Sequence, residues 1–258
     1  MPLTALALAL LGLTASAPRD GDERPPIERD GVLELTLPPL TGVEVEWFRL
    51  DPPASARPAE AEGPASPLGL VRLLRVPEAD GTLRLESETL LLDVQTRVAH
   101  VERLELSTLD VVWREVGVRH GRTVHVAWNR GEEVLRLSDT SGGEIRRREI
   151  DASQGVLMPL YLLEQLRAER LSAGEFRRLE PNSCAVELLD HRTGPTPWLR
   201  GVRLHTWRRP DGTLAGRYVF CGPRLVAFQL QEGGPVARAV PREAYERLRA
   251  SGWRALDR

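Results

Sequence analysis

Apolar and polar residues alternate at period two along most of the chain, which is typical of strands with one buried face. The pattern is clear in "VEVEWFRL" at residues 43–50 and in "VLELTLPPL" just before it. From Leu70 to about Ile150 it repeats in "LVRLLRV", "TLRLESETLLLDV", "AHVERLEL", "LDVVWREVGV", "TVHVAW", "EVLRLSD" and "EIRRREI". Short turns containing Gly, Asp or Ser separate these runs, so neighbouring strands are expected to be antiparallel. The sequence therefore predicts a meander.

The His120-Gly121 turn predicts a specific register for one hairpin. A two-residue loop there sets Trp113 directly across from Trp128, and Val116 opposite His125. A cross-strand aromatic pair of this kind stabilises a sheet by about 0.5 to 1 kcal/mol. Packing within the sheet is one interpretation of the two tryptophans, and a face on which a ligand stacks is the other.

The period changes at residues 151–176, "DASQGVLMPLYLLEQLRAERLSAGEF", which predicts a helix. Asp151 and Gln154 resemble a capping box at its start, and Gly174 lies just beyond Leu171 as a stop signal. The first turns, from Val156 to Leu163, are apolar all round, so burial on more than one side is expected. Such a helix usually lies inside a curved sheet or beneath a lid.

Strands resume after this helix, and a short helix closes the chain. The strand-like runs are "SCAVELLD", "VRLHTWRR", "LAGRYVF", "RLVAFQL" and "VARAV", with turns at Pro210-Asp211-Gly212 and Gly222-Pro223. The final helix is expected to open with Pro241 in its first turn, and Ala244, Tyr245 and Leu248 share one of its sides.

The N-terminal segment has the features of an export signal. An apolar run from Leu6 to Leu13 is followed by Ala15-Ser16-Ala17, which fits a signal-peptidase site, and the run is too short to span a membrane. We expect a signal peptide over residues 1–17 and a flexible tether over 18–30. A single β-rich domain then covers 31–258, with a mobile Pro-rich loop at 51–67. The expected location is the periplasm or cell envelope.

Composition narrows the functional classes. The chain has 258 residues, 41% hydrophobic, with a net charge of -2, which argues against a dedicated nucleic-acid binder. All 35 basic residues are Arg, because the sequence contains no Lys. Lysine-dependent catalysis, such as Schiff-base chemistry or a Walker-type phosphate site, is therefore excluded.

The two cysteines have three interpretations. In an exported protein Cys184 and Cys221 can form a disulfide, both can be buried free thiols, or Cys184 can act as a nucleophile with Asp190 and His191 nearby. A seven-residue strand spans about 20 Å, so the nucleophile would need the intervening chain to fold back.

No strong catalytic or metal motif is present. The sequence lacks G-x-S-x-G and G-x-G-x-x-G, and its five histidines have no metal-ligand spacing. We expect no catalytic residue, no metal and no cofactor, although an unrecognised hydrolase stays open as an alternative. The basic runs "GEIRRREI" and "TWRRPDG" fit either a solvated strand face or contact with anionic lipid headgroups.

The segments "VLMPLYLLEQLRAERLSAGEF" and "RYVFCGPRLVAFQLQEGGPVARAVPREAYERL" resemble bacterial envelope proteins related to the LolA-like superfamily of lipoprotein carriers. The resemblance covers about residues 70 to 250. It implies an unclosed, strongly curved antiparallel sheet wrapped around helices, with an apolar concave face that holds acyl chains or an apolar partner segment.

These observations predict an α+β, mostly β fold, a half-barrel of antiparallel strands around one or two helices. The expected function is an exported envelope protein that binds a lipid or acyl chain, with a lipid, a lipoprotein or another envelope protein as partner and peripheral membrane contact. The alternative is a non-enzymatic scaffold whose sheet is filled by its own side chains. The residues expected to line an apolar site are Val156, Leu157, Leu160, Tyr161, Trp113 and Trp128.

Overall fold

The computed structural model describes residues 42–53, 66–78, 82–104, 108–116, 121–129, 132–141, 143–180, 183–195 and 201–253. The signal peptide, the tether, the run "VLELTLPPL" and most of the Pro-rich loop lie outside these residues. Within the described part, the predicted α+β, mostly β fold is confirmed: one large antiparallel sheet accompanies two helices.

The sheet has strands β1(Glu44–Asp51), β2(Gly69–Pro77), β3(Leu83–Leu91), β4(Thr96–Leu104), β5(Thr108–Val116), β6(Gly121–Asn129), β7(Val134–Ser141), β8(Glu144–Asp151), β9(Gly174–Glu180), β10(Ala185–Pro195), β11(Val202–Arg208), β12(Leu214–Cys221), β13(Arg224–Gln229) and β14(Val236–Ala239). The helices are α2(Pro159–Arg167) and α3(Arg242–Gly252).

The strand order is β8-β7-β6-β5-β4-β3-β2-β1-β14-β13-β12-β11-β10-β9, with β1 and β14 pairing in the middle. Every other neighbouring pair is consecutive in the chain, as short turns between alternating runs predict. The last strand of the first meander, β8, and the first strand of the second, β9, are the two edges. The connection between these two edges contains α2.

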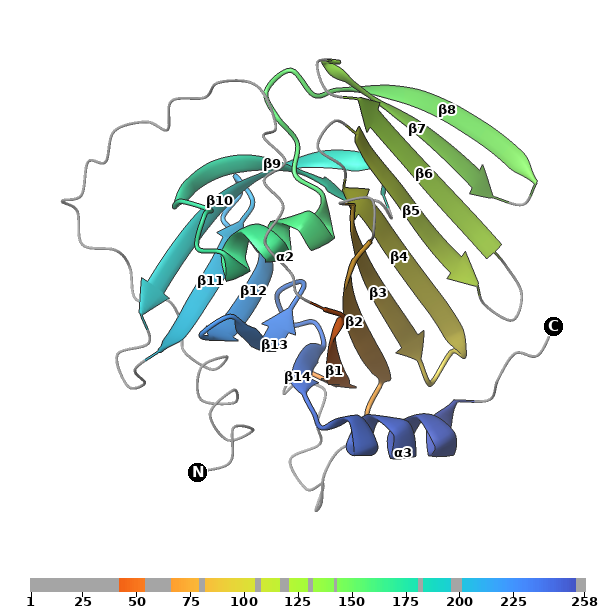
Figure 1. Ribbon diagram of the computed structural model, residues 1–258, viewed down its shortest axis with the longest axis vertical. Coiled ribbons are helices and arrows are strands. Elements are labelled where there is room, and N and C mark those ends of the chain that lie inside the picture. The colour runs from red at the N-terminus through yellow and green to blue at the C-terminus, as the bar shows by residue number, and fades with distance from the viewer. Residues whose placement is uncertain are drawn as a thin grey trace.

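The sheet curves so that β2 to β8 face β9 to β13, with α2 between the two walls (Figure 1). Apolar side chains of α2 join those of both walls in one core, including Leu162 and Leu166 from the helix, Val111 and Val124 from one wall, and Phe220 from the other. The second helix, α3, packs on the outer face of the sheet, where Tyr245 contacts Leu70 and Leu90. The sheet is thus wrapped around one helix rather than two.

The helix at residues 151–176 is much shorter than predicted. Strand β8 continues to Asp151, whose carboxylate accepts hydrogen bonds from the backbone N–H and hydroxyl of Ser153, so the expected capping box with Gln154 is wrong. Helix α2 begins at Pro159, a residue that favours the first helical position because it lacks an N–H. Gly174, the predicted stop, begins strand β9 instead.

The predicted register of the β5–β6 hairpin is also wrong. Val116 pairs with Gly121, so four residues rather than two separate the strands, and the whole register moves. Trp113 lies opposite Val124, and Trp128 lies opposite Leu109. His125 correspondingly faces Val112 instead of Val116.

Candidate functional site

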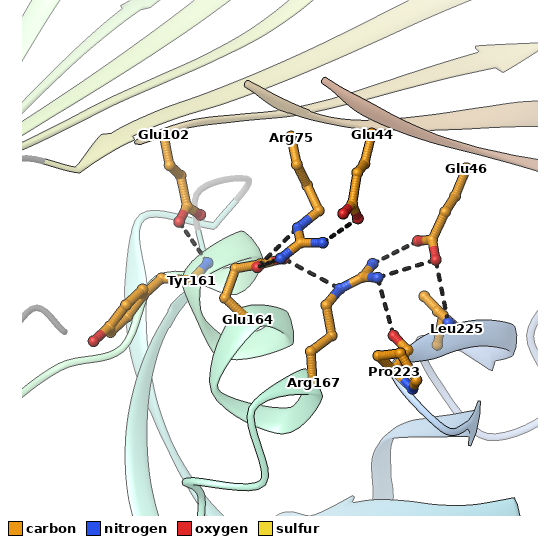
Figure 2. A network of polar contacts seen from close by, with 9 residues as sticks. All are labelled: Glu44, Glu46, Arg75, Glu102, Tyr161, Glu164, Arg167, Pro223 and Leu225. Carbon is orange, nitrogen blue, oxygen red and sulfur yellow. Dashed lines mark hydrogen bonds and ion pairs between the residues drawn. The ribbon is translucent and has the colours of Figure 1, made fainter. Parts of the chain in front are cut away.

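The concave side of the sheet carries charged side chains that point toward α2 (Figure 2). Arg75 of β2 donates to Glu164 of the helix from Nε at 2.9 Å and from Nη2 at 2.5 Å, and its Nη1 reaches Glu44. Arg167, one turn later on α2, holds both carboxylate oxygens of Glu46 from β1, at 3.0 and 2.5 Å. The helix is thus joined to two neighbouring strands by ion pairs.

These ion pairs lie in the interior. The side chains of Glu164 and Arg167 are 2% and 7% exposed, and burial raises the pKa of Glu164 although Arg167 and Arg75 lie beside it. The Arg167 guanidinium also donates to the carbonyl of Pro223, while Glu46 accepts the N–H of Leu225. The turn before β13 and the start of β13, on the second wall, are thereby tied to the same network.

Glu102 of β4 closes the N-terminal end of α2. Its two carboxylate oxygens accept the backbone N–H groups of Leu160 and Tyr161, at 2.8 and 2.7 Å, and its side chain is fully buried. His100 Nε2 lies 3.1 Å from the same carboxylate. A negative group at a helix N-terminus satisfies free N–H groups and complements the helix dipole, so Glu102 takes the place of a local cap.

Four of the residues expected to line an apolar site lie on α2 or just before it, and they pack in or against the core. Val156, Leu160 and Tyr161 are 0%, 7% and 2% exposed, and they belong to the cluster formed by the helix and both walls. Leu157 is half-buried and bridges to Arg178 on the edge of β9. In this structure protein side chains occupy the interior around these four residues.

The two tryptophans are not cross-strand partners. Trp128 is buried, and its indole N–H donates to the Glu132 carbonyl at 2.8 Å. For Trp113 the structure describes the backbone pairing alone, opposite His100 on one side and Val124 on the other.

The predicted Cys184–Cys221 disulfide is not formed, because both thiols are free. Cys184 belongs to the core inside the sheet, whereas Cys221 packs against the separate cluster of Val202, Val219 and Ala227 on the other side of β12. Neighbouring side chains alternate faces along a strand, and Phe220 beside Cys221 is the one that enters the interior. The two cysteines therefore lie on opposite faces.

Cys184 lies beside an arginine–aspartate pair. Arg122 holds Asp139 with two hydrogen bonds, at 2.9 and 2.8 Å, which lower the pKa of that carboxyl. A third contact runs from Arg122 Nη2 to Cys184 Sγ at 3.4 Å. Burial nevertheless raises the pKa of the thiol, so it stays protonated at neutral pH and is a weak nucleophile.

His191 is engaged elsewhere, in an aromatic cluster of the second wall. Its Nδ1 lies 2.9 Å from the Ser172 carbonyl and its Nε2 lies 3.0 Å from Nδ1 of His205, which stacks on it. Because a carbonyl only accepts, His191 donates from Nδ1, and His205 in turn donates to His191. Both rings are neutral, since burial lowers the pKa of each and brings that of His205 to about 4. His191 is therefore not placed to act as a base for Cys184.

A hollow of about 380 Å³ opens on the outer face of β6, β7 and β8. The short side chains of Ala127 and Ser138 lie between the longer ones of His125, Arg136 and Arg147. Within the described residues, no group of three His, Cys, Asp or Glu side chains is placed to hold a metal ion. Nor does the described part contain a helix long and apolar enough to cross a membrane.

Sequence reasoning missed the charged network beneath α2. Its signal is present: Glu164 directly follows the apolar first turn and a half of α2, and Glu46 occupies an inward position of β1 two residues before the buried Phe48. A charge at a position that periodicity assigns to the core indicates a buried partner. Which arginine meets which glutamate depends on contacts between residues up to 121 positions apart.

A scan against protein-family models and a search of curated proteins gave no match. Among solved structures, the chain is similar to the "Beta-barrel-like Protein of Domain of Unknown Function DUF1849 from Brucella abortus". The two are 11% identical, the match covers 77% of this chain and 94% of that chain, and the TM-score is 0.42. The comparisons show no LolA-like family for this chain.

Proposed function

We propose that the chain is a non-enzymatic interaction protein of the cell envelope whose half-barrel is permanently filled by its own helix. The observation that carries this proposal is the attachment of α2 inside the sheet by Arg75, Glu164, Arg167 and Glu46. A helix held by buried ion pairs, in addition to apolar packing, acts as part of the core.

The charges beneath α2 argue against a carrier of acyl chains. If the helix left to admit a ligand, Glu102, Glu46 and Arg75 would face an apolar molecule in place of their present partners. Leaving buried charges unpaired costs several kcal/mol per ion. The apolar surfaces of α2, with five buried leucine and tyrosine side chains, would also enter water at about 2 kcal/mol each.

Two further features support the assignment. His191 is engaged with Ser172 and His205 instead of with Cys184, and burial raises the pKa of the Cys184 thiol, which favours a binding role over nucleophilic catalysis. The apolar run ending at Ala15-Ser16-Ala17 supports export to the envelope.

The test is uptake of apolar molecules by protein purified from an exporting host. Native mass spectrometry is expected to give the bare mass of the chain after signal-peptide removal, and a fluorescent fatty acid added to the protein is expected to show no binding. A known fatty-acid carrier treated in parallel is the positive control. A co-purifying lipid, or saturable uptake of the probe, would overturn the filled half-barrel and restore the carrier hypothesis.

A further inference from the structure

Strand β8 is an open edge of the sheet. It pairs with β7 over eight consecutive residue pairs, from Val134 with Asp151 to Ser141 with Glu144, without the register shifts found between β11, β12 and β13. Seven of its eight residues are exposed. Among the described residues, no backbone hydrogen bond from another segment reaches its outer side. Alternate N–H and C=O groups of β8 therefore point away from the sheet, and no strand of the described residues meets them.

The opposite edge is partly covered by the chain itself. Leu157 donates from its backbone N–H to the Arg177 carbonyl at 2.8 Å and accepts from the N–H of Leu179 at 3.0 Å, both on β9. The two edges also converge where Arg177 lies 3.8 Å from Asp151 at the end of β8. Of the two described edge strands, only β8 therefore has an edge along its whole length that could pair with another strand.

The middle of β8 carries positive charge on both faces. Arg148 lies opposite the buried Leu137, on the inner face, and Arg147 lies opposite Ser138, on the outer face. Among the described residues no carboxylate lies within ion-pair distance of either guanidinium. Two nearby carboxylates have other partners: Asp139 pairs with Arg122, and Glu144 pairs with Arg146. An extended chain on this edge would meet one arginine on each side.

The outer hollow lies directly beside this edge. Arg147 forms one wall and Arg136 another, with Ala127 and Ser138 between them. Its volume of about 380 Å³ has room for a side chain of a chain bound along β8.

We propose that β8 binds an extended, acidic segment of a partner protein as an added strand. This proposal rests on the proposed function, because a half-barrel filled by α2 can bind a partner protein at its edge but not in its interior. Backbone hydrogen bonds would supply affinity, and two adjacent acidic residues would meet Arg147 and Arg148 on opposite faces. A second copy of this chain is unsuitable, since antiparallel β8 strands would place arginines against arginines.

The test uses a fluorescent peptide of about seven residues in which two adjacent glutamates are flanked by valine and threonine. Full-length protein is expected to bind it in fluorescence anisotropy, with amide NMR shifts confined to β8 and its neighbours. N-methylation of alternate peptide amides removes strand pairing while keeping the charge, and is expected to abolish binding. Replacing the two glutamates with lysines is expected to do the same.

The matching protein variants reverse the two charges. Arg147→Glu with Arg148→Glu is expected to weaken peptide binding by at least about tenfold. Arg224→Glu with Arg247→Glu changes the same charge at exposed positions of β13 and α3, and is expected to leave binding unchanged. Should the double variant of β8 fail to fold, the N-methylated peptide on the natural protein still decides the matter.

Three results would overturn the proposal: no peptide binding at low salt, equal binding of the N-methylated peptide, or equal affinity for anionic phospholipid vesicles. If the peptide fails while the protein takes up no apolar probe, only the β8 site is wrong. Uptake of the probe would instead remove the proposed function on which the site rests.

Discussion

At the scale of single residues, the second wall depends on close packing of rings. Trp207 is fully buried and contacts His191, Tyr218 and Phe176. Its indole lies against Gly216 on the neighbouring strand, where an added Cβ would come within 2.4 Å of the ring. A glycine at this position lets a large ring lie flat against the backbone.

Gly216→Ala is therefore expected to lower the free energy of unfolding by about 1 to 3 kcal/mol, since the ring must leave its rotamer or the strand must shift. The matched control is Gly194→Ala in β10, where an added Cβ would meet nothing within 4 Å. Urea titrations of both variants measure the difference. Equal stability of the two would show that Trp207 is not held as described.

The His191–His205 pair gives stability a defined pH dependence. Burial, then His191, then Arg203 lower the pKa of His205 from 6.5 to about 4. As pH falls below 6.5 the unfolded chain binds a proton that the folded chain refuses until about pH 4, so the free energy of unfolding decreases with falling pH. The loss across this window is up to about 3 kcal/mol.

His205→Gln is expected to flatten this part of the curve, measured by urea unfolding at several pH values between 4 and 7. A natural protein whose stability does not change between pH 6.5 and 4 would contradict the neutral histidine pair.

At the scale of elements, most strands and the helix that follows Pro241 were predicted well, whereas β9 and the start of α2 were not. The run "VRLHTWRR" forms β11 as predicted. Alternation of apolar and polar side chains can be recognised from a few adjacent residues, without knowledge of the rest of the chain. Helix α2 starts eight residues later than the capping-box pattern of Asp151 and Gln154 predicted. Its actual cap, Glu102, is 58 residues away from Leu160, so no local pattern contains it.

Arg167→Met tests the attachment of α2. The substitution leaves Glu46 with no arginine on α2 and removes one of the two arginines beside Glu164, and we expect a loss of about 3 kcal/mol in the free energy of unfolding. Arg247→Met on the exposed side of α3 is the control and is expected to leave the melting temperature unchanged. Similar losses in both variants would mean that the ion pairs do not hold the helix.

At the scale of the whole molecule, the curved sheet separates an inner from an outer surface. Cys184 directly precedes β10 and Cys221 ends β12, two strands of the same sheet. The two cysteines nevertheless lie on different surfaces of that sheet. The disulfide interpretation of the sequence rested on the expected export of the chain, which says nothing about the face to which each side chain points. The face to which each side chain points depends on strand register and on which side the helix fills.

Because Cys184 and Cys221 lie on opposite surfaces of the sheet, we predict that reductant has no effect on the stability of the protein. Thermal unfolding of protein from an exporting host is expected to give the same melting temperature with and without dithiothreitol, and thiol titration in denaturant is expected to find two free cysteines. A mass lower by two hydrogens, together with a lower melting temperature in reductant, would contradict the free thiols.

The sequence by itself determined most of the strands, the meander order, the exposed arginine-rich strand and the apolar character of the central helix, because each follows from short-range periodicity and turn residues. Tertiary structure decided the hairpin register of Trp128, the start of α2 at Pro159, the separation of the cysteines and the burial of Glu164 among arginines. These features depend on which distant segments of the chain come into contact. The free energy of a buried charge, or of an N–H at the start of a helix, is set by the partner that such a distant segment supplies.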